Sequence, residues 1–437
     1  MILELLLDVW ALFSILNFGA VGDGKTDNTV AINQAIEKAA SSKHHAIVEV
    51  PAGTYITGTI HMKSHVTLRL HSGAVLKGTD DLKAYEPLKP ISDLSRYESG
   101  RGTVNANSAY DPVWSQSLIQ MVGVGDAHIT GQGTIDGSHV FNPNGEEHQR
   151  GPHTILIADS KFVTLNGIHI KRSSNSAILA YNIEYASFSK LRIDEGWDGI
   201  HIRGGRNVEI DDCELHTGDD GIAGGYWDHM KIRNCQINSS CNGIRMIQPS
   251  TNLLVEHCRF YGPGLYAHRT SGNKNSLAAI SLEPGGWGPA PGRLDKITLR
   301  HLDIDQVNTP LSVTLSDDNR LGRLKISDVN ARDITRMALS VKSWGSARSE
   351  KVTLKNVTMN FRGIDDPQLP AWFKDQPTSK WPVFPSYALY FRNVDRVDMR
   401  NVKCDFSGNE YREPIIYDNV KSHTEKRVHC KKMQSND

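Results

Sequence analysis

Three aspartates have the spacing most suggestive of chemistry in this sequence. Asp198 and Asp220 lie 22 positions apart, each directly before a Gly-Ile pair, and Asp219 adjoins Asp220. If that interval is one structural repeat, the three carboxyls meet at one place. Carboxyls held close together raise one another's pKa, so one stays protonated while another is ionised. Hydrolysis of a glycosidic bond needs both states, an acid for the leaving oxygen and a base for water.

Two other uses of these aspartates stay open. Asp-Gly is a common turn pair, and clustered acids also bind calcium. Repetition in register, with a third acid alongside, favours catalysis over isolated turns. Few further oxygen ligands accompany the three acids, which counts against calcium, so we expect no metal at this site.

A repeat of 22 or 23 residues supplies the elements that would position the acids. The pattern apolar-x-apolar starts at Val163, Ala186, Val208, Met230, Leu253, Ile297, Leu324, Val352 and Val397. Short alternating runs indicate strands with one buried face, and such strands bury that face by stacking on their neighbours. The sequence therefore predicts an all-β fold, a single-domain right-handed parallel β-helix.

Register within the repeat predicts columns of like side chains. Twelve positions after the start of four successive strands stand Asn175, Asp198, Asp220 and Asn242. We expect these residues to stack with their backbones about 4.8 Å apart. Cysteines recur in the same way, and we expect reduced thiols that fill the core, with a disulfide between neighbouring rungs as the alternative. These cysteines are Cys213, Cys235 and Cys258.

An N-terminal helix is expected to cover the first rung, which would otherwise expose core and an unpaired strand edge. Residues 28–40 have approximate helical periodicity, and Thr26 or Asp27 could cap the first turn. The apolar face would comprise Val30, Ile32, Ala35, Ile36 and Ala39. The expected divisions are an N-terminal extension (1–16), the catalytic β-helix (17–425) and a polar tail (426–437). Insertions at 83–116, 261–293 and 362–386 are expected to wall a cleft.

The composition excludes several classes of partner. The 437 residues include 49 basic and 49 acidic side chains, without the basic excess of nucleic-acid or membrane-surface binders. No apolar run approaches the ~20 residues that span a bilayer, and residues 1–16 lack the features of a signal peptide. We therefore expect neither nucleic acid nor membrane as a partner, while the oligomeric state stays open.

Around the aspartates the chain resembles glycoside hydrolase family 28, the polygalacturonases and their relatives. Segments 18–27 (FGAVGDGKTD) and 131–137 (GQGTIDG) share in the resemblance. More specific are 197–200 (WDGI) and 218–223 (GDDGIA), which are similar to the family's Asn-Thr-Asp-Gly and Gly-Asp-Asp motifs.

The resemblance implies an inverting glycosidase that acts on a pectic or related oligo- or polysaccharide without a cofactor. It implies that Asp219 is the general acid and that Asp198 and Asp220 hold the attacking water. It also favours a secreted or periplasmic location.

Two family motifs are altered in this chain. Asn242 stands where the family's Gly-His-Gly motif has histidine, and the Arg-Ile-Lys motif that grips galacturonate falls near the segment ending in Glu283. Glu283 would repel a uronate, whereas Arg245 could restore positive charge. A neutral, α-galactoside-like substrate is therefore an alternative.

Residues around the acids are expected to contact the sugar, since flat rings stack on the apolar faces of sugars. The predicted substrate-binding residues are Trp197, His201, Trp227, Asn242, Arg245 and Glu283. Two rival functions stay open. One is a calcium-dependent polysaccharide lyase, disfavoured by the near-absence of lysine around the acids, and the other is a non-catalytic carbohydrate-binding β-helix.

Overall fold

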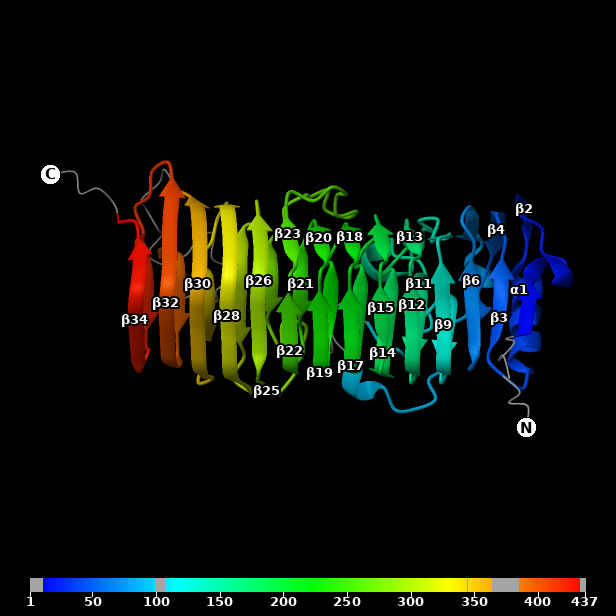
Figure 1. The fold of residues 1–437 in the computed structure, drawn as a ribbon, viewed down its shortest axis with the longest axis horizontal. Helices are drawn as coiled ribbons and strands as arrows, with labels where there is room; N and C mark the ends of the chain where they lie inside the picture. Colours follow the sequence, from blue (N-terminus) through cyan, green and yellow to red (C-terminus); the bar gives the residue numbers. More distant parts are fainter. Residues whose placement is uncertain (1–10, 99–106, 344, 364–384, 433–437) are drawn as a thin grey trace, which may run out of the picture.

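The computed structural model describes residues 11–98, 107–343, 345–363 and 385–432. Its strands form one continuous ladder, in which successive rungs lie side by side from one end to the other (Figure 1). The pairings between rungs are parallel, as between β14 (Ile178–Glu184), β17 (Ile200–Asp211) and β19 (Ile222–Arg233). The predicted fold class, an all-β right-handed parallel β-helix, is confirmed.

Stacked isoleucines build the core and fix the register. Ile178, Ile200, Ile222 and Ile244 take the same position on four consecutive rungs, and all are 0% exposed. Parallel strands about 4.8 Å apart bring like side chains into contact, and burial of each such side chain contributes roughly 1.5–3 kcal/mol. This stack also sets the position of the residues that enter each strand.

The predicted column of polar residues follows from this register, with one correction. Asp198 and Asp220 each lie two positions before the stacked isoleucine of their rung. Ser176, not Asn175, takes that position in the preceding rung. The connection that leads into β14 is one residue longer than the one that leads into β17. A count from the start of the strand therefore gave the wrong residue there.

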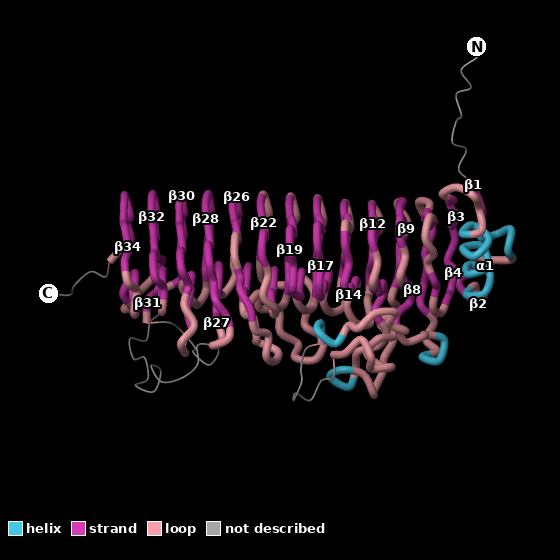
Figure 2. Tube along the Cα trace, turned by 90° about the horizontal axis from the view of Figure 1, so that it is seen from below, coloured by secondary structure: helices cyan, strands magenta, loops and turns pink. Residues whose placement is uncertain are grey.

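The predicted capping helix is present as α1 (Thr29–Ala40), which lies across the N-terminal end of the ladder (Figure 2). Its buried side chains are Ile32, Ala35, Ile36 and Ala39. Val30, predicted on the same face, is 68% exposed, so that part of the prediction was wrong. Asp27 Oδ1 accepts hydrogen bonds from the Thr29 backbone N–H at 2.9 Å and from its hydroxyl at 2.5 Å.

The β-helix continues past both expected domain boundaries, the one after residue 16 and the one after residue 425. β1 (Ala11–Ser14) and β34 (Ser422–Cys430) both pair with neighbouring rungs, so the ladder extends into the expected extension and tail. Residues 1–10 and 433–437 of those segments, and residues 364–384 of the insertion expected at 362–386, lie outside the described residues.

The long connections gather along one side of the ladder (Figure 2). They include short 3-10 helices such as Glu146–His148. The cysteines of the predicted column are buried and free, as expected. Within the described part of the chain, no helix has both the length and the apolar character needed to cross a bilayer.

Candidate active site

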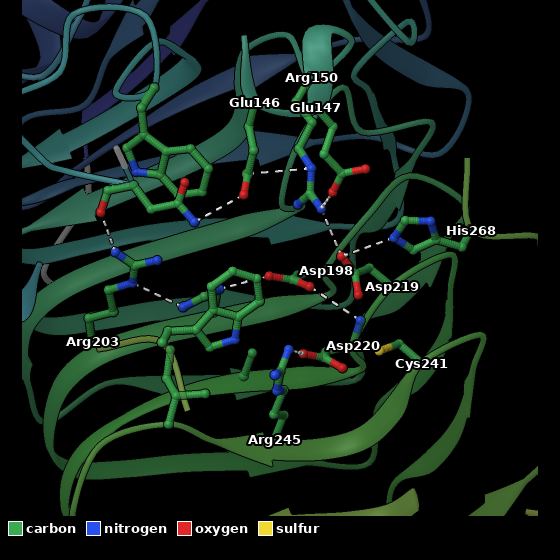
Figure 3. A pocket seen from close by; sticks show the side chains of 16 residues that line it. Glu146, Glu147, Arg150, Asp198, Arg203, Asp219, Asp220, Cys241, Arg245 and His268 are labelled. Carbon is green, nitrogen blue, oxygen red and sulfur yellow. Dashed lines mark hydrogen bonds and ion pairs between the residues drawn. The ribbon is translucent and has the colours of Figure 1, made fainter. Parts of the chain in front are cut away.

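The three predicted acids line one pocket, walled partly by rungs and partly by connections (Figure 3). Asp198 and Asp220 come from the turns that enter β17 and β19. The structure therefore brings together residues 22 positions apart in the sequence. The lining side chains are Asn107, Trp114, Glu146, Glu147, Arg150, Asp198, His201, Arg203, Asp219, Asp220, Ala223, Cys241, Arg245, Ile247, His268 and Trp287.

Asp198 is held by a chain of buried polar groups. Arg203 Nε donates to His201 Nε2 at 3.0 Å, which leaves the proton of a neutral His201 on Nδ1. That Nδ1–H donates to Asp198 Oδ2 at 2.7 Å, while the Asp220 backbone N–H donates to Asp198 Oδ1 at 3.2 Å. Burial, assisted by the charge of Arg203, lowers the pKa of His201 well below its usual value and keeps the ring neutral.

Arg203 fixes the position of this series of hydrogen-bonded groups. Its side chain is 0% exposed, and its Nη1 donates to the Asn107 carbonyl at 2.6 Å. The guanidinium lies 5.6 Å from the ring of Trp114 and 5.8 Å from that of Tyr181, within range of cation–π attraction. The orientation of His201, and through it that of Asp198, is thus set by a group in the interior.

Asp219 lies against two basic side chains, Arg150 and His268. Arg150 Nη2 donates to Asp219 Oδ2 at 2.9 Å, and His268 Nε2 lies 3.6 Å from the same oxygen. Arg150 also pairs with Glu147 at 2.6 Å and with Glu146 at 3.5 Å. Figure 3 shows this guanidinium reaching from the connection that holds both glutamates toward Asp219.

Asp220 is held from the next rung. Asn242 donates to Asp220 Oδ1 through its backbone N–H at 3.0 Å and its Nδ2 at 2.8 Å. Arg245 Nη1 lies 3.7 Å from Asp220 Oδ2, and Arg245 Nε donates to Glu283 Oε1 at 2.6 Å. Asn242 and Glu283, both predicted to bind substrate, are not among the lining residues and instead position Asp220 and Arg245.

The three carboxyls differ in their affinity for protons. Burial raises the pKa of Asp198 to about 7, and the charge of Asp219 adds to the rise. Burial likewise raises the pKa of Asp220 to about 7, against the opposing charge of Arg245. Burial acts in the same direction on Asp219, but His268 and Arg150 hold its pKa below the ordinary value. Near neutral pH, Asp219 is therefore ionised, whereas Asp198 and Asp220 are each partly protonated.

Two aromatic rings predicted to contact sugar lie in the interior. Trp227 is 1% exposed and donates its indole N–H to the Ile202 carbonyl at 2.8 Å. Trp197 is also 1% exposed, and its ring lies 3.9 Å from the guanidinium of Arg150, which it supports. Those two predictions were wrong, because closeness in sequence to a pocket residue does not determine which way a side chain points. Trp287, from a connection, does line the pocket.

The pocket residues that sequence reasoning missed lie mainly on connections. The missed residues are Asn107, Trp114, Glu146, Glu147, Arg150, Arg203, Ala223, Cys241, Ile247 and His268. The repeat gives no register for residues on connections, so nothing in the sequence linked Arg150 to Asp219. Arg203 is different, because it lies two positions after His201 on the same strand face. Alternation along a strand could have pointed to it.

Two sets of atoms in the pocket have the donor types of a cation site. Ligand atoms of Glu147, Asp219 and His268 lie within 4.8 Å of one another, as do those of Asp219, Asp220 and Cys241. Arg150 already occupies the Asp219 carboxylate, so its charge would compete with a metal ion there.

A second hollow adjoins the pocket and shares Ile247 and Trp287 with it. Arg96 and Tyr226 also line this hollow, where the guanidinium lies 4.7 Å from the ring. The two hollows together offer room for more than one unit of a chain-like ligand.

Comparison with known families matches residues 12–265 to the family described as rhamnogalacturonase A/epimerase, pectate lyase-like. A probable polygalacturonase from Vitis vinifera is 31% identical over 223 residues, which cover 48% of this chain and 43% of the relative. An exo-poly-alpha-D-galacturonosidase from Dickeya chrysanthemi is 29% identical over 210 residues, 47% of this chain and 32% of the relative. The chain thus spans less than half the length of these two relatives.

Solved structures share the fold at low sequence identity. A hyperthermoactive exopolygalacturonase from Thermotoga maritima has a TM-score of 0.56 at 16% identity, covering 90% of this chain and 91% of that one. PfbA, a surface adhesin of Streptococcus pneumoniae, has a TM-score of 0.59 at 15% identity, with coverage of 94% and 93%. At these identities the likeness concerns the fold alone.

Proposed function

Because the chain belongs to the rhamnogalacturonase A/epimerase, pectate lyase-like family, we propose that it is a glycoside hydrolase acting on a pectic or related saccharide. One observation carries the proposal: three carboxyls meet in one pocket, two of them buried, and their pKa values are split. Such a split supplies an acid and a base at the same pH. The resemblance to glycoside hydrolase family 28 and the polygalacturonases among the relatives support the same reaction.

The hydrogen bonds around the acids support distinct roles. Asp198 and Asp220 are held by donors, as suits two carboxylates that jointly orient and deprotonate a water. Asp219 would then protonate the leaving oxygen, the role that the family resemblance implies. In the free protein, however, Arg150 and His268 keep Asp219 ionised. We therefore propose that bound sugar displaces the Arg150 contact and that a proton of the cluster then moves to Asp219.

The charges of the pocket favour a neutral sugar at the point of cleavage. Five carboxyl side chains line the pocket against three guanidinium groups, and two of the five, Asp198 and Asp220, are partly protonated near neutral pH. Arg150 and Arg245 are both paired with protein carboxylates, and Arg203 is buried. A uronate would have to displace one of these partners and approach Glu146 and Glu147. The second hollow, lined by one cation, Arg96, and one carboxylate, Glu98, is less acidic than the pocket and is the better place for a charged unit of the same chain.

A substrate panel tests the proposal. Purified protein is incubated with pectic oligosaccharides and with aryl glycosides of neutral and uronic sugars, and released sugar is measured. We expect the wild type to hydrolyse a neutral glycoside, and we expect the rate to fall by at least ~100-fold in Asp219→Asn. Asp212→Asn removes an exposed carboxyl nearby in the chain and should leave the rate unchanged. Binding without turnover by the wild type would instead indicate a non-catalytic carbohydrate-binding protein.

Leaving-group dependence tests the assignment of roles. An acid variant loses little activity on aryl glycosides whose phenol leaves without protonation, whereas a base variant loses activity on all substrates. We expect the first pattern for Asp219→Asn and the second for Asp198→Asn. The reverse pattern would transfer the acid role to Asp198.

The stereochemical outcome is a separate part of the proposal. Nearest ligand oxygens of Asp219 and Asp220 lie within 4.8 Å, whereas carboxyl separations of ~6.5–9.5 Å accompany inversion and ~5–5.5 Å retention. Inversion is proposed from the family resemblance, and NMR of the first-formed anomer decides it. Activity that disappears with EDTA and returns with calcium would favour a lyase, as would an unsaturated product.

A further inference from the structure

Three metal-ligating side chains lie in one column on consecutive rungs, outside the pocket. His45 and His65 each directly precede a strand, and Asp126 is the second residue of the next strand in the stack. The strands are β3 (Ala46–Val50), β6 (Val66–Leu70) and β9 (Gly125–Gly131). Their parallel register places the three residues directly over one another, although 61 positions separate the second from the third.

The ligand atoms of this column already converge. His45 Nδ1 lies 3.0 Å and His65 Nδ1 lies 3.1 Å from the same oxygen, Oδ2 of Asp126. All three ligand atoms lie within 4.8 Å of one another. Zinc bonds of about 2.0–2.1 Å in a tetrahedron place neighbouring ligand atoms about 3.3 Å apart. To reach this spacing, each of the two His–Asp contacts would change by a few tenths of an ångström. The two imidazole nitrogens would have to move closer together by a larger amount.

A second layer of contacts orients the ligands. His45 Nε2 lies 2.7 Å from the Thr67 hydroxyl, so its N–H can donate there while Nδ1 faces the ion. His128 Nε2 lies 3.0 Å from Asp126 Oδ1, the carboxylate oxygen that does not contact His45 or His65, and its ring stacks on that of His45. Partners of this kind fix the imidazole tautomer and the carboxylate at metal sites.

We propose that His45, His65 and Asp126 bind one divalent transition-metal ion, with zinc as the best match. Two imidazole nitrogens and one carboxylate oxygen suit zinc, whereas calcium and magnesium prefer oxygen ligands throughout. The side chain of His65 is 69% exposed, so water can take the fourth position and the ion can enter from solvent. The bound ion joins three rungs near the capped end and would stabilise that end of the ladder.

Isothermal titration of untagged, EDTA-stripped protein with zinc chloride tests this site. We expect one zinc per chain, no comparable heat with magnesium chloride, and a melting temperature raised by about 2–5 °C at saturating zinc. Cobalt(II) bound there should give the visible absorption of a four-coordinate ion. Asp126→Asn and His65→Asn should each weaken binding by at least ~10-fold. Asparagine tolerates the left-handed backbone that both positions adopt, with φ of 54° and 60°.

Two controls separate this site from other histidines. His71 Nε2 lies 3.1 Å from Glu49, and no third ligand from the described residues converges there, so His71→Ala should leave zinc binding unchanged. Asp219→Asn removes the pocket cluster with His268 and Glu147 and should also leave it unchanged. Loss of zinc binding in Asp219→Asn but not in Asp126→Asn overturns the proposal, as does absence of zinc binding by the wild type. Neither result bears on hydrolysis.

Discussion

Asp220 is 3% exposed, and Asn242 donates two hydrogen bonds to the same carboxylate oxygen, Oδ1. Its folded pKa of about 7 exceeds an unfolded value of about 3.9, so the folded state holds the proton more tightly. The associated stability is present below pH ~4 and is lost as the pH rises to ~7. Above that range, the native state carries a buried charge on Asp220.

Asp220→Asn should therefore stabilise the protein at alkaline pH. Asparagine keeps the acceptor oxygen for Asn242 and carries no charge to bury. We expect a free energy of unfolding about 1–4 kcal/mol above that of the wild type at pH 8, and a difference near zero at pH 4. Urea titrations at the two pH values measure this, and an equal difference at both would rule out a charge-based cause.

Arg203 offers a test of positioning from within the interior. Arg203→Lys keeps a positive charge but loses the rigid planar donor that fixes the His201 tautomer. We expect kcat to fall by roughly 10–100-fold with little change in KM, since a small displacement of a reacting group has effects of this size. Arg206→Lys is the matched control on the same strand, at a side chain that is 59% exposed and pairs with Glu184. A rise in KM with kcat unchanged would contradict a positioning role.

At the scale of single elements, α1 provides a paired comparison. Ile36 is 0% exposed against the first rungs, whereas Val30 on the same helix is 68% exposed. Ile36→Ala should lower the free energy of unfolding by about 2–5 kcal/mol, and Val30→Ala should change it by no more than about 0.5 kcal/mol. Denaturant unfolding of both variants measures the contrast. Similar effects at the two sites would mean that α1 does not pack as described.

Elements whose position depends on periodicity could be predicted from the sequence. Alternation and a 22-residue interval identified β17 and β19, and with them the meeting of Asp198 and Asp220. One additional residue before β14 was enough to shift the predicted column there from Ser176 to Asn175. A strand pattern records which side chains are buried, but not the length of each turn.

Connections, by contrast, carry no periodic signal. Arg150 reaches Asp219 from a segment 69 positions away in the sequence, and His268 approaches the same carboxylate oxygen from a separate connection. Their placement depends on how each connection folds over the rungs. The orientation of Trp197 and Trp227 was missed for a related reason. Trp197 lies in the turn before β17, and Trp227 follows a residue of positive φ, Tyr226, within β19, so simple alternation does not give the direction of either side chain.

For the whole molecule, each rung contacts chiefly its two neighbours, so stability should vary along the ladder. Ile36→Ala should accelerate amide hydrogen exchange in residues 11–70, the region that contains α1 and the strands it contacts, and leave residues 319–334 unchanged. Exchange measured by mass spectrometry after proteolysis resolves the two regions. Uniform acceleration along the chain would instead indicate one cooperative unit.

The acids enter the pocket from rungs, and Arg150, His268 and Trp287 enter it from connections. Under the proposed function, the residues that determine the reaction type and those that determine ligand preference therefore lie in separate parts of the chain. A connection can lengthen, shorten or be exchanged while the stacked isoleucines keep Asp198 and Asp220 in place. Evolution, or a chimera that receives another connection at residues 138–152, can thus retarget this scaffold without rebuilding its reactive centre.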